Sequence, residues 1–426
     1  MNPPRLIVLL WIGALLFPAA CTKVDGFRCA NDGDCGDDAC FGFCARLDPD
    51  CASGFVYAPS AGSVAGQCVE VTTEDAGPSA DAFVPATIIY VDASAADDSG
   101  DGTESMPYKT IARGLREAEA GAQVQVAPGL YNAANGEVFP LTVPAGVYLV
   151  GDQAGKGAGT GAETTIVGDA PVASTDFRAA VVASDGAFVA GFGFAVGDEV
   201  GTAGVLMLDV TAEVSDCTFT AGFAGVAISG AGDTLVRDSL FDMPEIEGGS
   251  LNPFQDESGI YGFEYSGRPV IDGNVVTGLG GGITMTGSGF ATIRNNQISG
   301  ANGVAIRATA ARLQGNTIFN PTEACFVTYG EVVARGNNCA VDTGPGILVQ
   351  SGDPDFGTQT DSGNNVFAGA TTNAVNFATS ANTFRTVTAI GNAWFGSAEL
   401  DCAMVFAFEG DRVLWSSADG GQVCPP

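Results

Sequence analysis

A tetrapeptide that begins with polar residues and ends with an apolar one recurs along the second half of the chain. Its copies read DCTF, DSLF, GNVV, NNQI, GNTI, GNNC, NNVF and GNAW. Their second residues are Cys217, Ser239, Asn274, Asn296, Asn316, Asn337, Asn365 and Asn392, at steps of 22, 35, 22, 20, 21, 28 and 27 residues. A glycine-rich repeat of about 20–25 residues is typical of a solenoid whose coils are β-strands.

Apolar residues flank each tetrapeptide at a spacing that requires a bend. Val214 precedes Phe219 by five positions, and Ile293 precedes Ile298 by the same interval. Because side chains alternate along a straight strand, residues an odd number apart cannot both face the core. We therefore expect each asparagine to occupy a left-handed bend and its amide to stack on that of the next coil. Ordinary Asn-Gly hairpins of an antiparallel fold are the alternative.

A second strand of the form glycine, apolar, any residue, apolar follows the tetrapeptides, as in GVAI at 225–228 and again at 303–306. We expect the interior to be lined by Val226, Ile260, Ile283, Val304, Cys325 and Ile347. Residues just before the bend should point outwards, with weak surface ion pairs among them: Ser215, Arg237, Asp272, Arg294, Gln314 and Arg335. Together these columns predict an all-β fold, a right-handed parallel β-helix.

The composition of the chain argues against one class of partner and excludes two kinds of chemistry. It has 49 acidic and 17 basic residues, a formal net charge of −32, which argues against nucleic acid as a partner. Histidine is absent, which excludes Ser–His–Asp catalysis and metals held by histidine.

Residues 1–20 have the pattern of a bacterial lipoprotein signal peptide. Arg5 precedes an apolar run at 6–17, which is too short to span a bilayer but suits a secretory signal. Two alanines then stand directly before Cys21, which we expect to carry the lipid. The protein would be exported and anchored in the cell envelope, at the outer membrane on its periplasmic or surface side; plain secretion is the alternative.

The cysteines support export, because disulfides persist in oxidising compartments. Six of the 12 predict a small disulfide-rich module at 21–70: Cys29, Cys35, Cys40, Cys44, Cys51 and Cys68. Zinc is the rival ligand, but the module holds no CxxC pair. Cys402 and Cys424 should close a C-terminal tail at 401–426, whereas Cys325 and Cys339 could pair or remain buried thiols.

The segment between the module and the repeats predicts a linker and then a cap. Residues 71–87 are acidic, small and without an apolar pattern, which favours a flexible linker before a β-helix domain at 88–400. Ile111, Leu115 and Ala118 lie at helical spacing, so a helix from Thr110 to about Ala120 should cap the open end of the first coil.

The first coils carry a set of short motifs. They are a strand at 89–91, Gly-Thr at 102–103, Pro-Tyr-Lys-Thr-Ile at 107–111, Pro-Gly-x-Tyr at 128–131 and Gly-Glu-x-Phe-Pro-Leu at 136–141. This set resembles the domain of unknown function that opens many bacterial right-handed β-helix proteins and, more distantly, the start of some pectate lyases. The resemblance implies a pectin-lyase-like fold and no established activity.

Catalysis on this fold would need acidic side chains on the outer face of the second strand. The outward positions expected there are Ala227, Ser229, Tyr261, Phe263, Thr284, Thr286, Ala305, Arg307, Phe326, Thr328, Leu348 and Gln350. None is a carboxylate, and Glu264 only neighbours the set. Glycoside hydrolysis needs two carboxylates, and a lyase needs a base and usually calcium. The sequence therefore favours a protein without catalysis, with a lyase or hydrolase of acidic polysaccharide as the alternative.

The same face predicts a carbohydrate-binding surface, because aromatic rings beside polar groups suit sugars. Its candidate residues are Phe254, Tyr261, Phe263, Tyr265, Arg307 and Phe326, beside an extra segment at 243–259. Packing of these rings between coils is the alternative. A weaker candidate is a calcium site at Asp92, Asp97, Asp98 and Asp101, for which turn formation is the alternative.

These patterns lead to one main hypothesis of function. It is a lipid-anchored cell-envelope protein whose rigid β-helix serves surface display or carbohydrate binding, with polysaccharide or envelope components as partners. A passive structural spacer would share every feature except ligand binding.

Overall fold

The computed structural model describes most of the β-helix and a few residues before it. The described residues are 85–157, 163–243, 258–277, 281–300, 303–341, 344–369, 374–377, 385–394, 405–406 and 411–414, with 39–40, 44–47, 55–57 and 67 before them. The chain divides into two compact units, Met1–Val84 and Pro85–Pro426. In the first unit, β1 (Ala39–Cys40), β2 (Cys44–Leu47) and β3 (Phe55–Tyr57) form an antiparallel sheet.

Several predicted features lie outside the described residues. They are the signal peptide, the lipid-bearing Cys21, the linker up to residue 84, Phe254, and the paired Cys402 and Cys424. Of the module cysteines, only the backbone of Cys40 and Cys44 is described.

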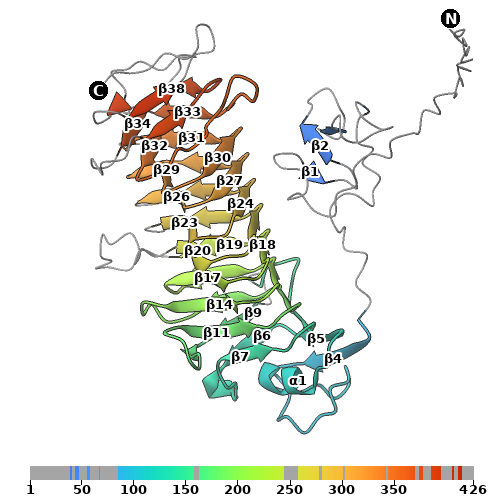
Figure 1. Ribbon diagram of the computed structural model, residues 1–426. Helices are drawn as coiled ribbons and strands as arrows, with labels where there is room; N and C mark the ends of the chain where they lie inside the picture. Colours follow the sequence, from blue (N-terminus) through green and yellow to red (C-terminus); the bar gives the residue numbers. More distant parts are fainter. Residues whose placement is uncertain are drawn as a thin grey trace, which may run out of the picture. The chain divides into compact units, whose positions relative to one another are not determined.

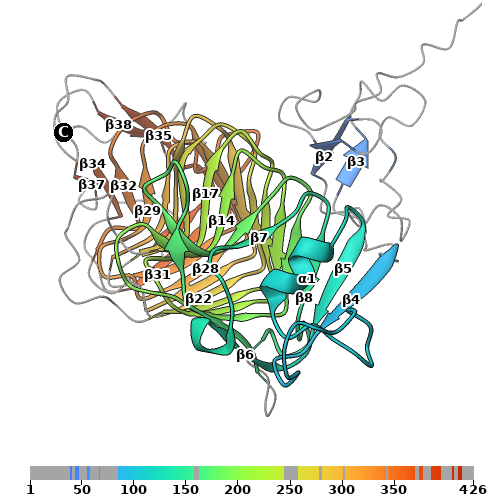
Figure 2. The same cartoon turned by 90° about the horizontal axis from the view of Figure 1, so that it is seen from below.

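The second unit is built from three long sheets whose strands stack coil over coil (Figures 1 and 2). Sheet 1 contains β7 (Leu141–Val143), β10 (Ala170–Pro171), β11 (Arg178–Ala183), β14 (Thr202–Leu208), β17 (Ala224–Gly230), β20 (Ser258–Tyr265), β23 (Gly281–Gly287), β26 (Val304–Ala308), β29 (Ala324–Thr328), β32 (Ile347–Val349), β34 (Val375–Phe377) and β37 (Val405–Phe406). Sheet 2 contains β4 (Thr87–Val91), β5 (Ala122–Val126), β8 (Tyr148–Val150), β12 (Phe188–Ala190), β15 (Glu213–Ser215), β18 (Leu235–Arg237), β21 (Val270–Asp272), β24 (Ala291–Arg294), β27 (Ala311–Gln314) and β30 (Val332–Arg335). Sheet 3 contains β6 (Gly129–Asn132), β9 (Thr164–Val167), β13 (Gly193–Ala195), β16 (Thr218–Ala221), β19 (Leu240–Asp242), β22 (Val275–Thr277), β25 (Gln297–Ser299), β28 (Thr317–Phe319), β31 (Asn338–Val341), β33 (Val366–Gly369) and β36 (Ala393–Trp394).

The pairing of these strands confirms the predicted right-handed parallel β-helix. Neighbouring strands of the three sheets run parallel, apart from β10, which pairs antiparallel with β11. A further parallel pair, β35 (Thr386–Thr388) and β38 (Arg412–Leu414), lies near the C-terminal end of the described chain. There the buried Arg385 and Asp411 form an ion pair, with Nη2 and Oδ2 2.6 Å apart.

Large side chains stack in register inside sheet 3. The rings of Phe194 and Phe219 are 4.9 Å apart between centroids, and those of Phe219 and Phe241 are 4.7 Å apart, nearly parallel in both cases. Phe367 and Trp394 repeat the arrangement at 4.5 Å. All five side chains are buried, so successive coils form one continuous apolar core.

The predicted asparagine ladder is present at the bend between sheets 2 and 3. The Nδ2 of Asn296 donates to Oδ1 of Asn316 at 3.0 Å, and the backbone N–H of Asn296 donates to the same oxygen at 3.1 Å. The identical pair of bonds joins each asparagine from Asn274 to the next, ending at Asn392. Ser239 and Cys217 continue the column by backbone N–H bonds, to Asn274 Oδ1 and Ser239 Oγ respectively. Burial raises the pKa of the free Cys217 thiol to about 12, so it is a packed, unreactive group.

The predicted left-handed conformation of the asparagines is wrong by one residue. The positive φ angles fall on the residue before each ladder position, with values from 50° to 77°: Asp216, Asp238, Gly273, Asn295, Gly315, Gly336, Asn364 and Gly391. The chain turns at this preceding residue, which leaves the ladder side chain directed inwards at the next coil's amide.

The register of sheet 1 corrects a second expectation. Ile306, not Val304, pairs with Ile283, because the repeated letters GVAI stand two residues earlier in the coil at 303–306 than at 225–228. Val304 instead packs outside the main core against Val327. Phe326 takes the inward position, since it pairs with Ile306 and Ile347.

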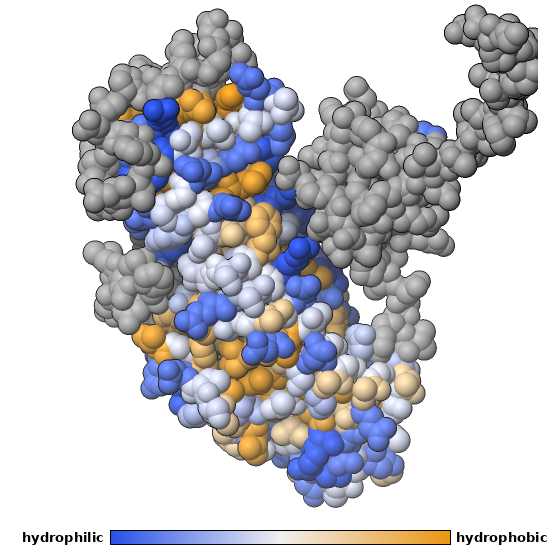
Figure 3. All heavy atoms as spheres, in the orientation of Figure 1, coloured by the Kyte–Doolittle hydropathy of each residue, from blue (hydrophilic) through white to orange (hydrophobic). Residues whose placement is uncertain are grey.

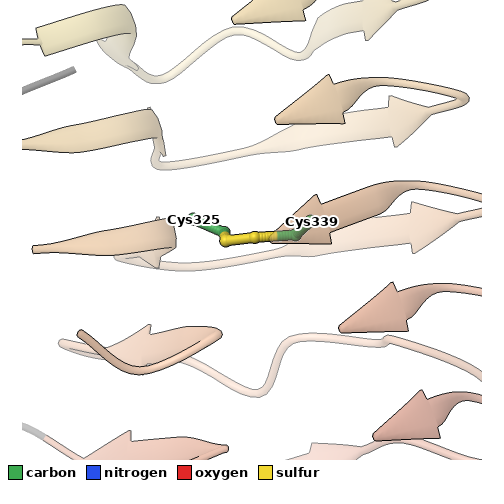
Figure 4. The surroundings of a disulfide bond; sticks show 2 residues. All are labelled: Cys325 and Cys339. Atoms are coloured by element: carbon green, nitrogen blue, oxygen red, sulfur yellow. A yellow bond between two sulfur atoms is a disulfide. The ribbon is translucent and has the colours of Figure 1, made fainter. Parts of the chain in front are cut away.

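Cys325 does face the interior, as expected, and it forms a disulfide with Cys339 (Figure 4). This bond joins sheet 1 to sheet 3 within a single coil, where the sequence had left two buried thiols as the alternative. It adds a covalent tie to a core that is otherwise held by packing and by the ladder.

The column before the bend follows the predicted order, but it departs from the expected pairing at Arg237 and from the expected exposure at Ser215. Ser215, Arg237, Asp272, Arg294, Gln314 and Arg335 pair in succession. Arg294 pairs with Asp272 at 2.9 Å as expected, whereas Arg237 pairs with Glu213. Ser215 is buried rather than exposed; the segment 151–157 lies beside this bend, where Lys156 Nζ is 3.7 Å from Asp216 Oδ1.

Helix α1 (Ile111–Glu117) lies over the first strands (Figure 2), as the predicted cap requires. It is shorter than expected, since it ends at Glu117, with Ala118 as its C-cap. Glu137 accepts the N–H groups of Ile111 and Ala112, at 2.6 and 3.1 Å, and burial raises the pKa of its carboxyl. The glutamate of the Gly-Glu-x-Phe-Pro-Leu motif therefore caps this helix, near the 3₁₀ turn η3 (Ala133–Asn135). No helix in the described part of the chain is long and apolar enough to cross a membrane.

Candidate functional site

The outer face of sheet 1 is the surface on which the sequence placed its candidate residues. Strand pairing sets one outward column across this face: Val182, Leu206, Ala227, Tyr261, Thr284, Arg307, Val327, Leu348 and Asn376. Five of these positions were predicted to face outwards, and Val327 replaces Phe326. From β11 to β34 this column contains no carboxylate, so the column itself offers neither the acid pair of a glycosidase nor an acidic calcium site.

Four aromatic side chains form a cluster on this face, which we call the ring cluster: Phe177, Phe223, Tyr261 and Phe263. The rings of Tyr261 and Phe263 stack with centroids 5.8 Å apart, and Phe177 lies against Phe263 at 5.0 Å. Phe223 meets Tyr261 edge-on at 5.7 Å. Tyr261 is 8% exposed, whereas Phe177 and Phe263 are half-buried and present part of each ring to solvent.

Sequence reasoning found two members of the ring cluster and missed the other two. Phe177 directly precedes β11 in the hairpin that begins with β10, and Phe223 directly precedes β17. Neither position belongs to the repeating tetrapeptide or to the second strand. The repeat therefore carries no signal for these two residues, because their contacts arise where strands begin.

Two other candidates turn inwards and cannot meet a ligand from outside. Tyr265 is fully buried, and its hydroxyl donates to the carbonyl of Ala310 at 3.3 Å. A bulge between Phe263 and Tyr265, with Glu264 at φ 47°, breaks the alternation on which the prediction rested. Phe326 is buried against the ring of Phe356.

Arg307 lies in the predicted outward column but is only 5% exposed. In the same column, Thr284 Oγ1 lies 2.9 Å from Ser258 Oγ on the neighbouring strand. The exposed part of the candidate site therefore reduces to Phe177 and Phe263, with two hydroxyl-bearing residues near them. Thr286 pairs with Phe263, and Ser229 lies on β17 between the residues that pair with Gly262 and Tyr265.

Charged residues adjoin the ring cluster in sequence. Arg178, next to Phe177, has its Nε 2.7 Å from Asp169 Oδ1 and 3.6 Å from Glu199 Oε2. Asp176 and Glu264 are exposed and directly adjoin Phe177 and Phe263 in sequence. Asp169 and Glu199 thus balance the charge of Arg178. Asp176 and Glu264 remain exposed.

The acidic loop at 92–101 uses its carboxylates to hold its own backbone. Asp92 and Asp97 each accept the N–H two residues ahead, at 2.7 and 2.8 Å. Asp98 accepts the N–H groups of Lys109 and Thr110, at 2.8 and 2.9 Å. Hydrogen bonds from Ser99 and Thr103 lower the pKa values of Asp97 and Asp101. Over the described residues, no three acidic or cysteine side chains are gathered so as to hold a metal ion.

Three solved structures are similar to this chain at low identity. Pectate lyase Pel9A has 14% identity and a TM-score of 0.47, covering 75% of this chain and 82% of that one. The A-module of the mannuronan C-5 epimerase AlgE6 from Azotobacter vinelandii has 14% identity and a TM-score of 0.42, with 71% and 91% covered. The GH136 lacto-N-biosidase from Eubacterium ramulus has 11% identity and a TM-score of 0.40, with 77% and 67% covered.

A comparison with curated proteins found no match. Residues 94–397, by contrast, match a protein family described as "Protein of unknown function (DUF1565)". The match begins within the acidic loop and extends through the last strand of sheet 3, which is well over half of the chain. The protein therefore belongs to the DUF1565 family.

Proposed function

We propose that this protein is a lipid-anchored component of the bacterial cell envelope whose β-helix binds carbohydrate through the ring cluster, without catalysis. The observation that carries the proposal is the half-exposed pair Phe177 and Phe263 on the outer face of sheet 1. Sugar rings present C–H groups on one face, which pack on aromatic rings, and hydroxyls at the edge, which bond to polar neighbours. Thr286, which pairs with Phe263, and Ser229, on the neighbouring strand β17, supply such neighbours.

The absence of acids from the outward column supports binding rather than cleavage. Where the strands of sheet 1 are described, no two carboxylates share that column at the separation that glycoside hydrolysis needs. A lyase or hydrolase of acidic polysaccharide remains the second hypothesis, and its products would reveal it.

Export is supported by the disulfide of Cys325 and Cys339, because such bonds persist in oxidising compartments. The lipid on Cys21 then accounts for retention at the membrane, since a net charge of −32 is repelled by anionic lipid headgroups.

The binding proposal is tested by glycan-array screening and calorimetry of the mature chain, with and without calcium. Phe263→Ala should weaken binding about tenfold, because loss of one ring contact is worth about 1 kcal/mol or slightly more. Phe319→Ala is the matched control: it is a phenylalanine on sheet 3, 42% exposed and away from the ring cluster, and its removal should leave affinity unchanged.

Three outcomes would contradict the proposal. Absence of any glycan ligand would leave the passive spacer. Equal losses for Phe263→Ala and Phe319→Ala would place the ligand elsewhere. Release of reducing ends or unsaturated sugars would establish the enzyme.

The anchor is tested separately by mass spectrometry of membrane-extracted protein. A diacylglyceryl group on Cys21 is expected, and Cys21→Ala should release the protein to the soluble fraction. An unmodified cysteine on soluble protein would refute the anchor and leave the binding proposal untouched.

A further inference from the structure

The charges around the ring cluster limit the kind of glycan that fits it. Phe177 stands between Asp176 and Arg178 in sequence, and Phe263 is followed by Glu264. The guanidinium of Arg178 is already paired with Asp169 at 2.7 Å and approached by Glu199 at 3.6 Å. Two exposed carboxylates, Asp176 and Glu264, thus adjoin the exposed rings in sequence, and the cation beside them, Arg178, is already paired.

We infer that the ring cluster binds a neutral glycan and discriminates against polymers of uronic acids or sulfated sugars. This inference rests on the proposed function and names its ligand class. A carboxylate or sulfate on a sugar stacked upon Phe263 would approach Glu264 and Asp176, and each like-charge contact would weaken binding. The chain's excess of 49 acidic over 17 basic residues adds a long-range repulsion of the same sign.

Arg307, on strand β26, does not reverse this preference for neutral glycans. Arg307 lies in the outward column with Tyr261 and Thr284, but its side chain is 5% exposed and has little contact with solvent. An acidic polymer lying along sheet 1 would therefore meet the carboxylates beside the rings before it could meet this guanidinium. A neutral glycan meets no like-charge repulsion at the same place. Its hydroxyls can form hydrogen bonds with the carboxylates as well as with Ser229 or Thr286.

The test compares neutral and acidic glycans by the part of their binding that depends on Phe263. A panel of neutral polymers and of uronate or sulfated polymers is measured against the unaltered chain, Phe263→Ala and Phe319→Ala, in chelator and again in calcium. The glycans whose binding falls about tenfold in Phe263→Ala should all be neutral. Their affinity should change less than twofold between about 50 mM and about 500 mM salt, because screening acts on charged partners.

Each result decides a different point. An acidic glycan whose binding depends on Phe263, in chelator or in calcium, overturns the neutral class while leaving the carbohydrate proposal intact. An affinity that falls several-fold with salt overturns it in the same way. If no glycan shows binding that depends on Phe263, the proposed function fails and the inference fails with it.

Discussion

One group of aromatic rings lies inside the β-helix and another lies on its outer face, and the two groups are built differently. Inside, Phe194, Phe219 and Phe241 stack nearly parallel at 4.9 and 4.7 Å, each supplied by the same position of successive sheet 3 strands. Outside, the ring cluster joins Phe177 and Tyr261 with two further rings at mixed angles, from different positions in their coils. The inner stack is a product of the repeat, whereas the outer cluster departs from it. Repetition thus builds the core, and its exceptions mark the candidate site (Figure 3 shows apolar residues gathered around β11 to β17 on this face of the molecule).

The largest effect should come from the inner stack. Phe241→Ala removes a fully buried ring that stacks on Phe219 and leaves a cavity in the core. We expect a loss of about 3–5 kcal/mol in the free energy of unfolding, measured by denaturant titration. A loss smaller than that of Phe263→Ala would mean that the assignment of inner and outer faces is inverted.

The ladder should give the next largest effect. Asn296→Leu deletes amide bonds to Asn316 and to the carbonyl of Ile271, and it leaves the donors of Asn274 without their acceptor. The expected cost is about 2–4 kcal/mol. Arg294→Ala, two residues away and half-exposed, should cost under about 0.5 kcal/mol. Equal shifts in thermal melts of the two variants would refute the ladder as a source of stability.

The left-handed bend should give an intermediate effect that isolates the backbone. Gly336 has φ 62°, and a Cβ added there would meet nothing within 4 Å. Gly336→Ala should therefore cost about 1 kcal/mol through conformation alone, and Gly336→Asn should cost less, because asparagine tolerates this region. If both variants melt like the unaltered protein, the residue before the ladder does not govern the bend.

The ring cluster should contribute little to stability. Phe263→Ala removes a half-buried ring, and its cost should be about 1 kcal/mol or less. The same variant should lose most of its glycan binding, which separates the two faces by function as well as by stability. A large loss of stability with unchanged binding would assign these rings to packing.

The repeating part of the fold could be predicted from the sequence because one tetrapeptide sets the register of every coil. The ladder from Asn274 to Asn392 and the column from Arg237 to Arg335 follow the expected order. The predicted side-chain positions are wrong where that register is locally broken. A bulge turns Tyr265 inwards, and a shift of two residues in GVAI exchanges Val304 for Ile306.

The candidate site was harder to predict for the same reason. Phe177 and Phe223 reach the ring cluster from positions just before strands, where neither alternation nor spacing constrains the side chain. Arg307 was placed in the correct column, but its burial depends on neighbours that a single strand does not reveal.

The ladder also has a direction, and this sets how the chain can change length. Each amide donates to the coil that follows, so the joint between Asn296 and Asn316 is the same as that between Asn316 and Asn337. Removing residues 297–316 would bring Asn296 onto Asn337 with donor and acceptor already matched. Duplication or loss of whole coils is therefore nearly free of cost along this seam. The ring cluster has no such freedom, because its rings come from different coils and meet only while those coils keep their order.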